Sequence, residues 1–187
     1  FNHEKYPNQD FVMTMGNPGS DFQFTNKKDG ISLKPELATG RIPCYTTEEA
    51  QNYLDKVIEY EAVGYNNLWR KNLLHLSGGT SETESKMFLG VVNEFKDRAV
   101  GLHYGADVET QSKTTDEAVE FINVSGPVNA GVGMLTFLGH SAPNYTGVDI
   151  GMVSNDLNGY KNKGKYPLLW LNGCNTTDVF NAYFRVR

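Results

Sequence analysis

Apolar and polar positions follow one another in blocks along this chain, and two of the apolar blocks end in the same way. Residues 133–138 have the length and the β-branched and aromatic content of a buried strand, and Gly139-His140-Ser141 follows them. Residues 166–171 show the same pattern and are followed by Asn172-Gly173-Cys174. Each block therefore predicts a core strand that leads into a loop at a glycine, with a histidine after the first strand and a cysteine after the second.

Polar residues that cap helices mark the starts of the predicted helices. Thr46 and Glu49 form a capping box, in which each side chain accepts a backbone amide of the first turn, and the helix that follows ends at Gly64. A second helix is predicted from 82 to 97, and a further capping box at Thr114 and Glu117 predicts a short helix through Ile122. The apolar residues at helical spacing are Ala50, Tyr53, Leu54, Val57 and Ile58 in the first helix, and Phe88, Val91, Val92 and Phe95 in the second.

The remaining apolar blocks predict strands at 68–76 and 100–108, and we interpret the histidine within each, His75 and His103, as structural. Residues 147–158 are predicted to be a loop with a helical turn. Residues 1–45 are irregular and contain a predicted hairpin, with strands at 11–15 and 21–25 around a Gly-Asn-Pro-Gly turn. We interpret 1–45 as the tail of a preceding subdomain, and 46–187 as the main subdomain, truncated at its C-terminal side.

The alternation of strands and helices after residue 45 predicts an α/β fold with a parallel sheet and helices on both faces. Because crossovers between parallel strands are right-handed, the loops that follow the strands share one edge of such a sheet. The loops expected at this edge are 77–84, 109–113, 140–144 and 174–178.

His140 and Cys174 are the candidate catalytic residues. Each alone is more simply explained as a satisfied polar residue or a small buried hydrophobic one. Together, at the ends of two strands that are expected to be adjacent and parallel, and each after a glycine, they favour a nucleophilic thiol with a base that holds it as thiolate near neutral pH. Cys44, which follows Ile42-Pro43, is interpreted as a packing residue.

Composition narrows the classes of function. The net charge of −5 and the absence of a basic stripe argue against a nucleic-acid partner, and no apolar stretch approaches the roughly 20 residues that span a bilayer. Two cysteines are too few for a disulfide framework or a structural zinc site. The abundance of Asn, Gly, Tyr and Thr suits an extracytoplasmic bacterial protein.

A series of short motifs occurs in a distinctive order and spacing along nearly the whole chain from about residue 11. They are 17–21 (Asn-Pro-Gly-Ser-Asp), 40–43 (Gly-Arg-Ile-Pro), 48–50 with 56–61, 69–71 (Trp-Arg-Lys), 77–79 (Ser-Gly-Gly), 139–141, 165–169 (Lys-Tyr-Pro-Leu-Leu) and 172–174. In these motifs and their order, the chain resembles the gingipain-type cysteine peptidases. Within that family it resembles the sortase-like members of type IX secretion.

This resemblance implies a caspase-like fold and a role for each site residue. Cys174 would attack the scissile carbonyl, while His140 would activate the thiol and later protonate the leaving amine. Gly139 or Gly173, with the backbone amide of Cys174, would form the oxyanion site. Family members often add an acid that orients the histidine; Glu82 is the candidate, although the helix dipole alone also favours an acid there. No cofactor is expected. Calcium occurs in some relatives, but no compact loop of oxygen ligands is visible.

Three hypotheses about function follow. In the first, the chain is an incomplete catalytic domain of a cysteine endopeptidase, secreted, periplasmic or associated with the outer membrane, which acts on protein or peptide substrates by hydrolysis or by sortase-like transfer. Its partners would include other parts of a longer parent polypeptide, because relatives carry further strands after the cysteine. In the second, it is a non-catalytic caspase-like module that binds a partner or scaffolds a secreted assembly.

The third hypothesis is a hydrolase or transferase that uses residues 77–80. The sequence there supports it less, because it has neither the Gly-x-Ser-x-Gly elbow nor a Walker lysine.

Overall fold

The computed structural model describes residues 21, 24–26, 35–42, 44 and 46–176, and these form two units whose boundary lies within helix α1 (Thr47–Ala62), after Tyr53. In the first unit the predicted capping box of α1 is confirmed, because Thr46 Oγ1 accepts the Glu49 amide at 3.1 Å while Glu49 Oε2 accepts the Thr46 amide at 3.3 Å. Phe24 donates its amide to the Asp21 carbonyl, so this part of the predicted strand 21–25 is a turn. The other strand of the predicted hairpin lies outside the described residues.

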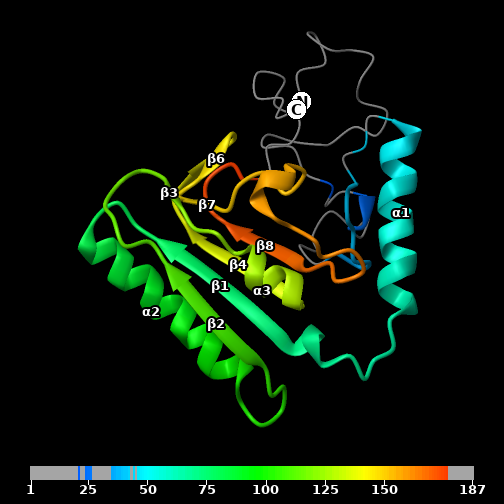
Figure 1. The fold of residues 1–187 in the computed structure, drawn as a ribbon, viewed down its shortest axis with the longest axis horizontal. Coiled ribbons are helices and arrows are strands. Elements are labelled where there is room, and N and C mark those ends of the chain that lie inside the picture. Colours follow the sequence, from blue (N-terminus) through cyan, green and yellow to red (C-terminus); the bar gives the residue numbers. More distant parts are fainter. Residues whose placement is uncertain (1–20, 22–23, 27–34, 43, 45, 177–187) are drawn as a thin grey trace. The chain divides into compact units, whose positions relative to one another are not determined.

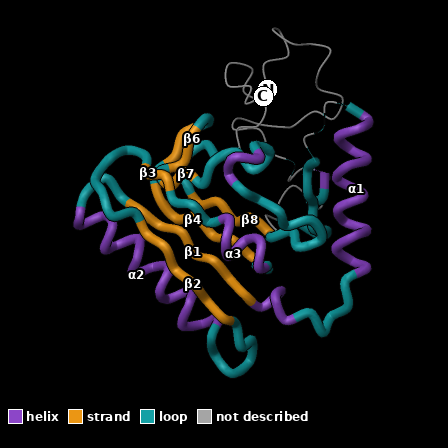
Figure 2. Tube along the Cα trace, viewed as in Figure 1, coloured by secondary structure: helices purple, strands orange, loops and turns teal. Residues whose placement is uncertain are grey.

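The second unit is built on a four-stranded sheet (Figures 1 and 2). Every neighbouring pair of strands is parallel. The predicted α/β class and parallel sheet are therefore confirmed, and so is the expectation that the histidine strand and the cysteine strand are neighbours. In spatial order the strands are β2 (Asp107–Ser112), β1 (Asn72–Gly78), β4 (Met134–Gly139) and β8 (Leu168–Asn172).

Alternate residues of β1 face opposite layers, as the period of a strand requires. Leu74 and Leu76 belong to a buried cluster with α3 (Ser125–Ala130), whereas His75 faces α2 (Glu82–Ala99) and meets the ring of Phe95 edge-on at 6.5 Å. Helices thus cover both faces of β1. Each fully buried aliphatic or aromatic side chain in such a core contributes about 1.5–3 kcal/mol. The whole cluster comprises Leu74, Leu76, Val124, Val128, Val132, Leu135, Phe137 and Val148.

Short elements complete the second unit. Strand β3 (Glu120–Phe121) pairs in parallel with β7 (Val148–Asp149), and β5 (Ser141–Ala142) pairs in antiparallel fashion with β6 (Tyr145–Thr146). The 3₁₀ helices are η2 (Leu68–Lys71) and η3 (Asp156–Asn158). No helix within the described residues is long and apolar enough to cross a membrane.

In the second unit, two predicted strands begin later than expected and one predicted helix does not form. The strand predicted at 68–76 begins only at Asn72, after η2. The strand predicted at 100–108 begins at Asp107, because Gly101 and Gly105 build a turn before it and Gly105 adopts a left-handed φ of 64°. The helix predicted at Thr114 does not form, because the backbone and hydroxyl groups of Thr114 and Thr115 donate to the Glu120 carboxylate and hold a loop.

Strand β8 lies where it was predicted but is not buried. Its residues are all exposed, because β8 is an edge strand of the sheet and the described residues leave it uncovered. Leu168, Leu169 and Trp170 each expose more than half of their surface.

Candidate active site

Parallel pairing brings the carboxyl ends of three strands to one edge of the sheet. Gly78 is paired with Gly139, and Leu138 is paired with Asn172, so β1, β4 and β8 end side by side. The loops that carry His140 and Cys174 leave from this edge, and so does the turn before α2, which has Glu84 in its first helical turn; the sequence predicted loops from all three strands here.

The Gly-His-Ser and Gly-Cys loops are in direct contact. Ser141 Oγ donates a hydrogen bond of 2.6 Å to the carbonyl oxygen of Cys174. A methyl group on Gly173 would lie 2.3 Å from Ser141 Oγ and 2.9 Å from the Gly139 carbonyl oxygen, closer than atoms can approach. The glycine before the cysteine is thus explained by this close approach, which brings the backbone of Cys174 to the residue next to His140.

His140 has an acidic partner. Its Nε2 lies 3.2 Å from Glu84 Oε2, and its ring meets Phe88 of α2 edge-on with the ring centroids 5.7 Å apart. Glu84 Oε2 also accepts the backbone amide and the hydroxyl of Thr80, each at 2.9 Å. The Thr80 amide first, then its hydroxyl and then His140 lower the pKa of Glu84 below its ordinary value. A charged carboxylate is therefore held against the imidazole, although 46% of the His140 side chain is exposed.

The acid beside the histidine is Glu84 and not Glu82, the residue predicted from the sequence. Glu82 is directed to solvent, with 80% of its side chain exposed, and forms an ion pair of 2.6 Å with Lys86. Residues two apart on an α-helix point to nearly opposite sides, so only one of these two glutamates can face the strand ends. The sequence does contain a signal for Glu84, because Ser81 and Glu84 have the spacing of a capping box. Ser81 is the N-cap of α2, and its Oγ accepts the Glu84 amide at 3.3 Å.

Cys174 is exposed and free, and Asn175 after it adopts a left-handed φ of 56°. Thr176 Oγ1 donates to the Gly173 carbonyl at 3.3 Å, which closes the turn that presents the thiol. The oxyanion role of Gly139, Gly173 and the Cys174 amide stays a prediction. Cys44, the other free cysteine, is partly buried in the first unit.

Within residues 46–176 and the shorter described segments before them, no three His, Cys, Asp or Glu side chains are grouped so as to hold a metal ion.

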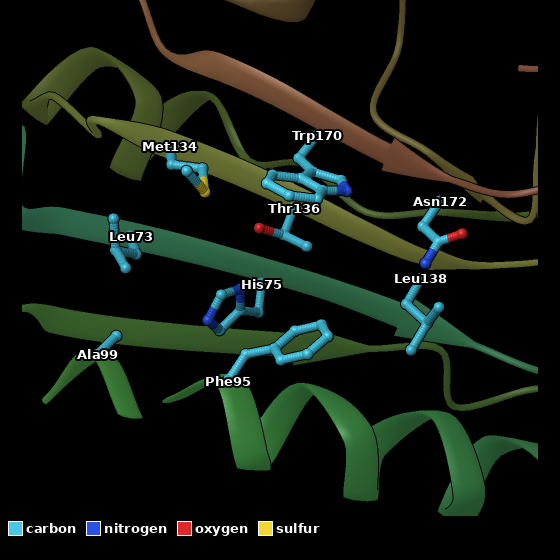
Figure 3. Close-up of a pocket in the computed structure, with 9 residues that line it drawn as sticks. All are labelled: Leu73, His75, Phe95, Ala99, Met134, Thr136, Leu138, Trp170 and Asn172. Carbon is cyan, nitrogen blue, oxygen red and sulfur yellow. The ribbon is translucent and has the colours of Figure 1, made fainter. Parts of the chain in front are cut away.

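An apolar groove of about 280 Å³ lies on the α2 face of the sheet, below the edge that carries the loops. Figure 3 shows its side chains, with His75, Thr136 and Trp170 in one row across β1, β4 and β8 and Phe95 beside His75. The groove runs up to Asn172, the last residue of β8, so one end of it lies next to the cysteine loop.

Comparison with known proteins shows the fold and the family of the chain. The chain is similar to two solved structures of the proteinase RgpB. One is the Arg-specific cysteine proteinase gingipain R, at 18% identity and a TM-score of 0.65 over 91% of this chain and 39% of that one. The other is the complex of Porphyromonas gingivalis RgpB pro- and mature domains, at 16% identity and a TM-score of 0.59 over 86% of this chain and 38% of that one.

The chain thus spans less than two fifths of the length of these solved relatives, and the shared fold is the caspase-like one that the motifs implied. Among curated proteins none matches significantly. The model of peptidase family C25 matches residues 2–185. The chain therefore belongs to peptidase family C25, the gingipain-type cysteine peptidases that its motifs resemble.

Proposed function

We propose that this chain carries the reacting residues of a cysteine endopeptidase, with Cys174 as nucleophile, His140 as general base and acid, and Glu84 as the acid that orients the histidine. Two contacts at the carboxyl edge of the sheet support this proposal most. The Ser141 hydroxyl ties the cysteine loop to the histidine loop, while Glu84 holds the imidazole.

The hydrogen bond to Glu84 selects the reactive nitrogen of His140. When Nε2 donates its proton to the carboxylate, Nδ1 keeps the lone pair and is the base of the ring. His140 would take the proton of the Cys174 thiol, and the thiolate would attack the peptide carbonyl carbon to form a tetrahedral oxyanion. The imidazolium would then protonate the leaving amine, which leaves an acyl-enzyme thioester.

The fate of the thioester defines two versions of the proposal. Attack by water gives a hydrolase, and attack by a second amine gives a sortase-like transferase; the sequence resemblance to type IX secretion sortases is the support for the latter. An extracytoplasmic location fits either version. Because the chain spans less than two fifths of its solved relatives, the parts that select the substrate are proposed to lie in the rest of a parent polypeptide.

Cleavage of a peptide library by the intact protein, followed by mass spectrometry, tests the proposal. Cys174→Ala and His140→Ala should each abolish cleavage, whereas Cys44→Ala should retain it. Undiminished cleavage by Cys174→Ala would contradict the assignment of the nucleophile. A protein that shows no cleavage, and whose Cys174 reacts like an ordinary thiol, would instead be the non-catalytic module considered from the sequence.

A further inference from the structure

Lys113 is a buried cation beside the candidate site, directly after β2. Only 6% of its surface is exposed. Its Nζ donates a hydrogen bond of 2.9 Å to the Gly79 carbonyl and another to the Glu117 carbonyl. Among the described residues, no carboxylate lies within ion-pair distance of this ammonium. Burial of an ammonium costs free energy unless its N–H donors are hydrogen-bonded. The two backbone carbonyls accept these hydrogen bonds and so offset the cost of burying Lys113.

The side chain of Lys113 crosses the chain at the end of β1. A methyl group on Gly78 would lie 2.3–2.8 Å from three carbon atoms of the lysine side chain, so Gly78 leaves the space that Lys113 fills. The Lys113 amide also donates to the Ser77 carbonyl at 2.9 Å, which continues the pairing of β1 and β2 past its last registered pair. Lys113 therefore fixes the end of β1 through two groups, its backbone amide and its side-chain ammonium.

The turn that Lys113 holds is the one that orients Glu84. A methyl group on Gly79 would lie 2.4 Å from Glu84 Cβ, and the Gly79 amide donates to Ser85 Oγ at 3.2 Å. The next residue, Thr80, supplies the two hydrogen bonds that hold the Glu84 carboxylate against His140. A continuous path of contacts thus leads from the ammonium through the Gly79 carbonyl to the acid of the site.

We propose that Lys113 is a positioning residue of this site, whose buried ammonium fixes the Gly79 carbonyl and thereby keeps Glu84 on His140. The inference rests on the proposed function, and it concerns the Glu84–His140 pair rather than the thiol. It predicts that loss of the Lys113 ammonium releases the Glu84 carboxylate from the ring of His140.

The test is the NMR signal of the His140 Nε2 proton in the intact protein, with the resonance assigned by its loss in His140→Ala. A proton donated to a carboxylate resonates downfield and exchanges slowly with water, so Glu84→Gln should shift this signal upfield and speed its exchange by roughly tenfold or more. Lys113→Met, which keeps the length of the side chain and removes its charge, should produce most of that change. The double variant should match Glu84→Gln alone, because both changes remove the same contact.

Lys86→Met is the matched control, since it removes an exposed lysine two residues from Glu84 and should leave the Nε2 proton signal of His140 unchanged. Should Lys113→Met fail to fold, Gly78→Ala displaces the same side chain while the charge stays in the protein, and the same faster exchange is expected. An unchanged Nε2 proton signal in Lys113→Met, with a changed one in Glu84→Gln, overturns the role of Lys113 and leaves the proposed function standing. An unchanged signal in Glu84→Gln overturns the pair itself, and the role of Lys113 with it.

Discussion

At the scale of single residues, the assignment of Glu84 depends on the geometry of one helix turn. Glu82 and Glu84 both lie in the first turn of α2, where the helix dipole favours acids in general. Composition and position therefore could not separate them. The separation comes from the 3.2 Å contact with His140 and from the two Thr80 hydrogen bonds, which depend on the path of the preceding turn.

The pair of glutamates offers a matched test. Glu84→Gln should lower kcat/KM for peptide cleavage by roughly 10- to 100-fold, because the imidazole loses the charge that orients it and stabilises its protonated form. Glu82→Gln, one half-turn away, should stay close to wild type, since its partner Lys86 is itself exposed. Equal losses in the two variants would remove Glu84 from the site.

The burial of His75 predicts that the folded protein loses stability in acid. It is 3% exposed and neither ring nitrogen has a hydrogen-bond partner among the described residues. Burial first, and then the positive charge of Lys96, lower the pKa of His75 below its ordinary value. The unfolded chain therefore takes up a proton as the pH falls below about 6.5, where folded His75 stays neutral, and stability is lost in that range.

Urea unfolding at pH 7 and pH 5 measures this effect. The free energy of unfolding of the wild type should fall by about 1 kcal/mol more than that of His75→Phe over this interval. His103→Phe is the control, as a histidine in the exposed turn before β2. The contribution of His75 would be refuted by identical losses in wild type and His75→Phe.

At the scale of elements, the glycines at the ends of β4 and β8 explain why these strands could be predicted so well. Each glycine is required by a close approach: Gly139 by the Gly78 carbonyl, and Gly173 by Ser141. The glycines of the Gly-His-Ser and Gly-Cys motifs are thus needed because the ends of the neighbouring strands are in contact. The capping box at Thr114 lacked such support, because Glu120 competed for the same donors from a neighbouring strand.

Substitution of two glycines by alanine should have opposite effects. Gly173→Ala forces a methyl group against Ser141 Oγ and the Gly139 carbonyl, and it should lower both thermal stability and the reactivity of Cys174. Gly90→Ala, within α2 and with no atom within 4 Å of the added carbon, should stabilise the protein by about 0.5–1 kcal/mol. Thermal unfolding monitored by circular dichroism measures both, and a neutral Gly173→Ala would show that the two loops are not packed as described.

At the scale of the whole chain, the sequence predicted the parallel sheet, the neighbouring histidine and cysteine strands, and the family. These follow from the period of apolar positions and from short motifs, which are local properties. The exposure of β8 and the apolar groove beside Trp170 could not be predicted, because burial depends on which other segments cover a strand. The role of Lys113 was likewise hidden, since a lysine in a polar loop gives no sign in the sequence that the fold buries it.

The central claim is that Cys174 and His140 form a thiolate–imidazole pair, and the rate of alkylation by iodoacetamide tests it most directly. The rates of Cys174 and Cys44 would be measured by peptide mass spectrometry from about pH 5 to pH 9, in the wild type and in His140→Ala. Below about pH 7, Cys174 should be alkylated much faster than Cys44, and His140→Ala should abolish the difference. Two thiols that titrate alike in the wild type, with no response to His140→Ala, would contradict the claim.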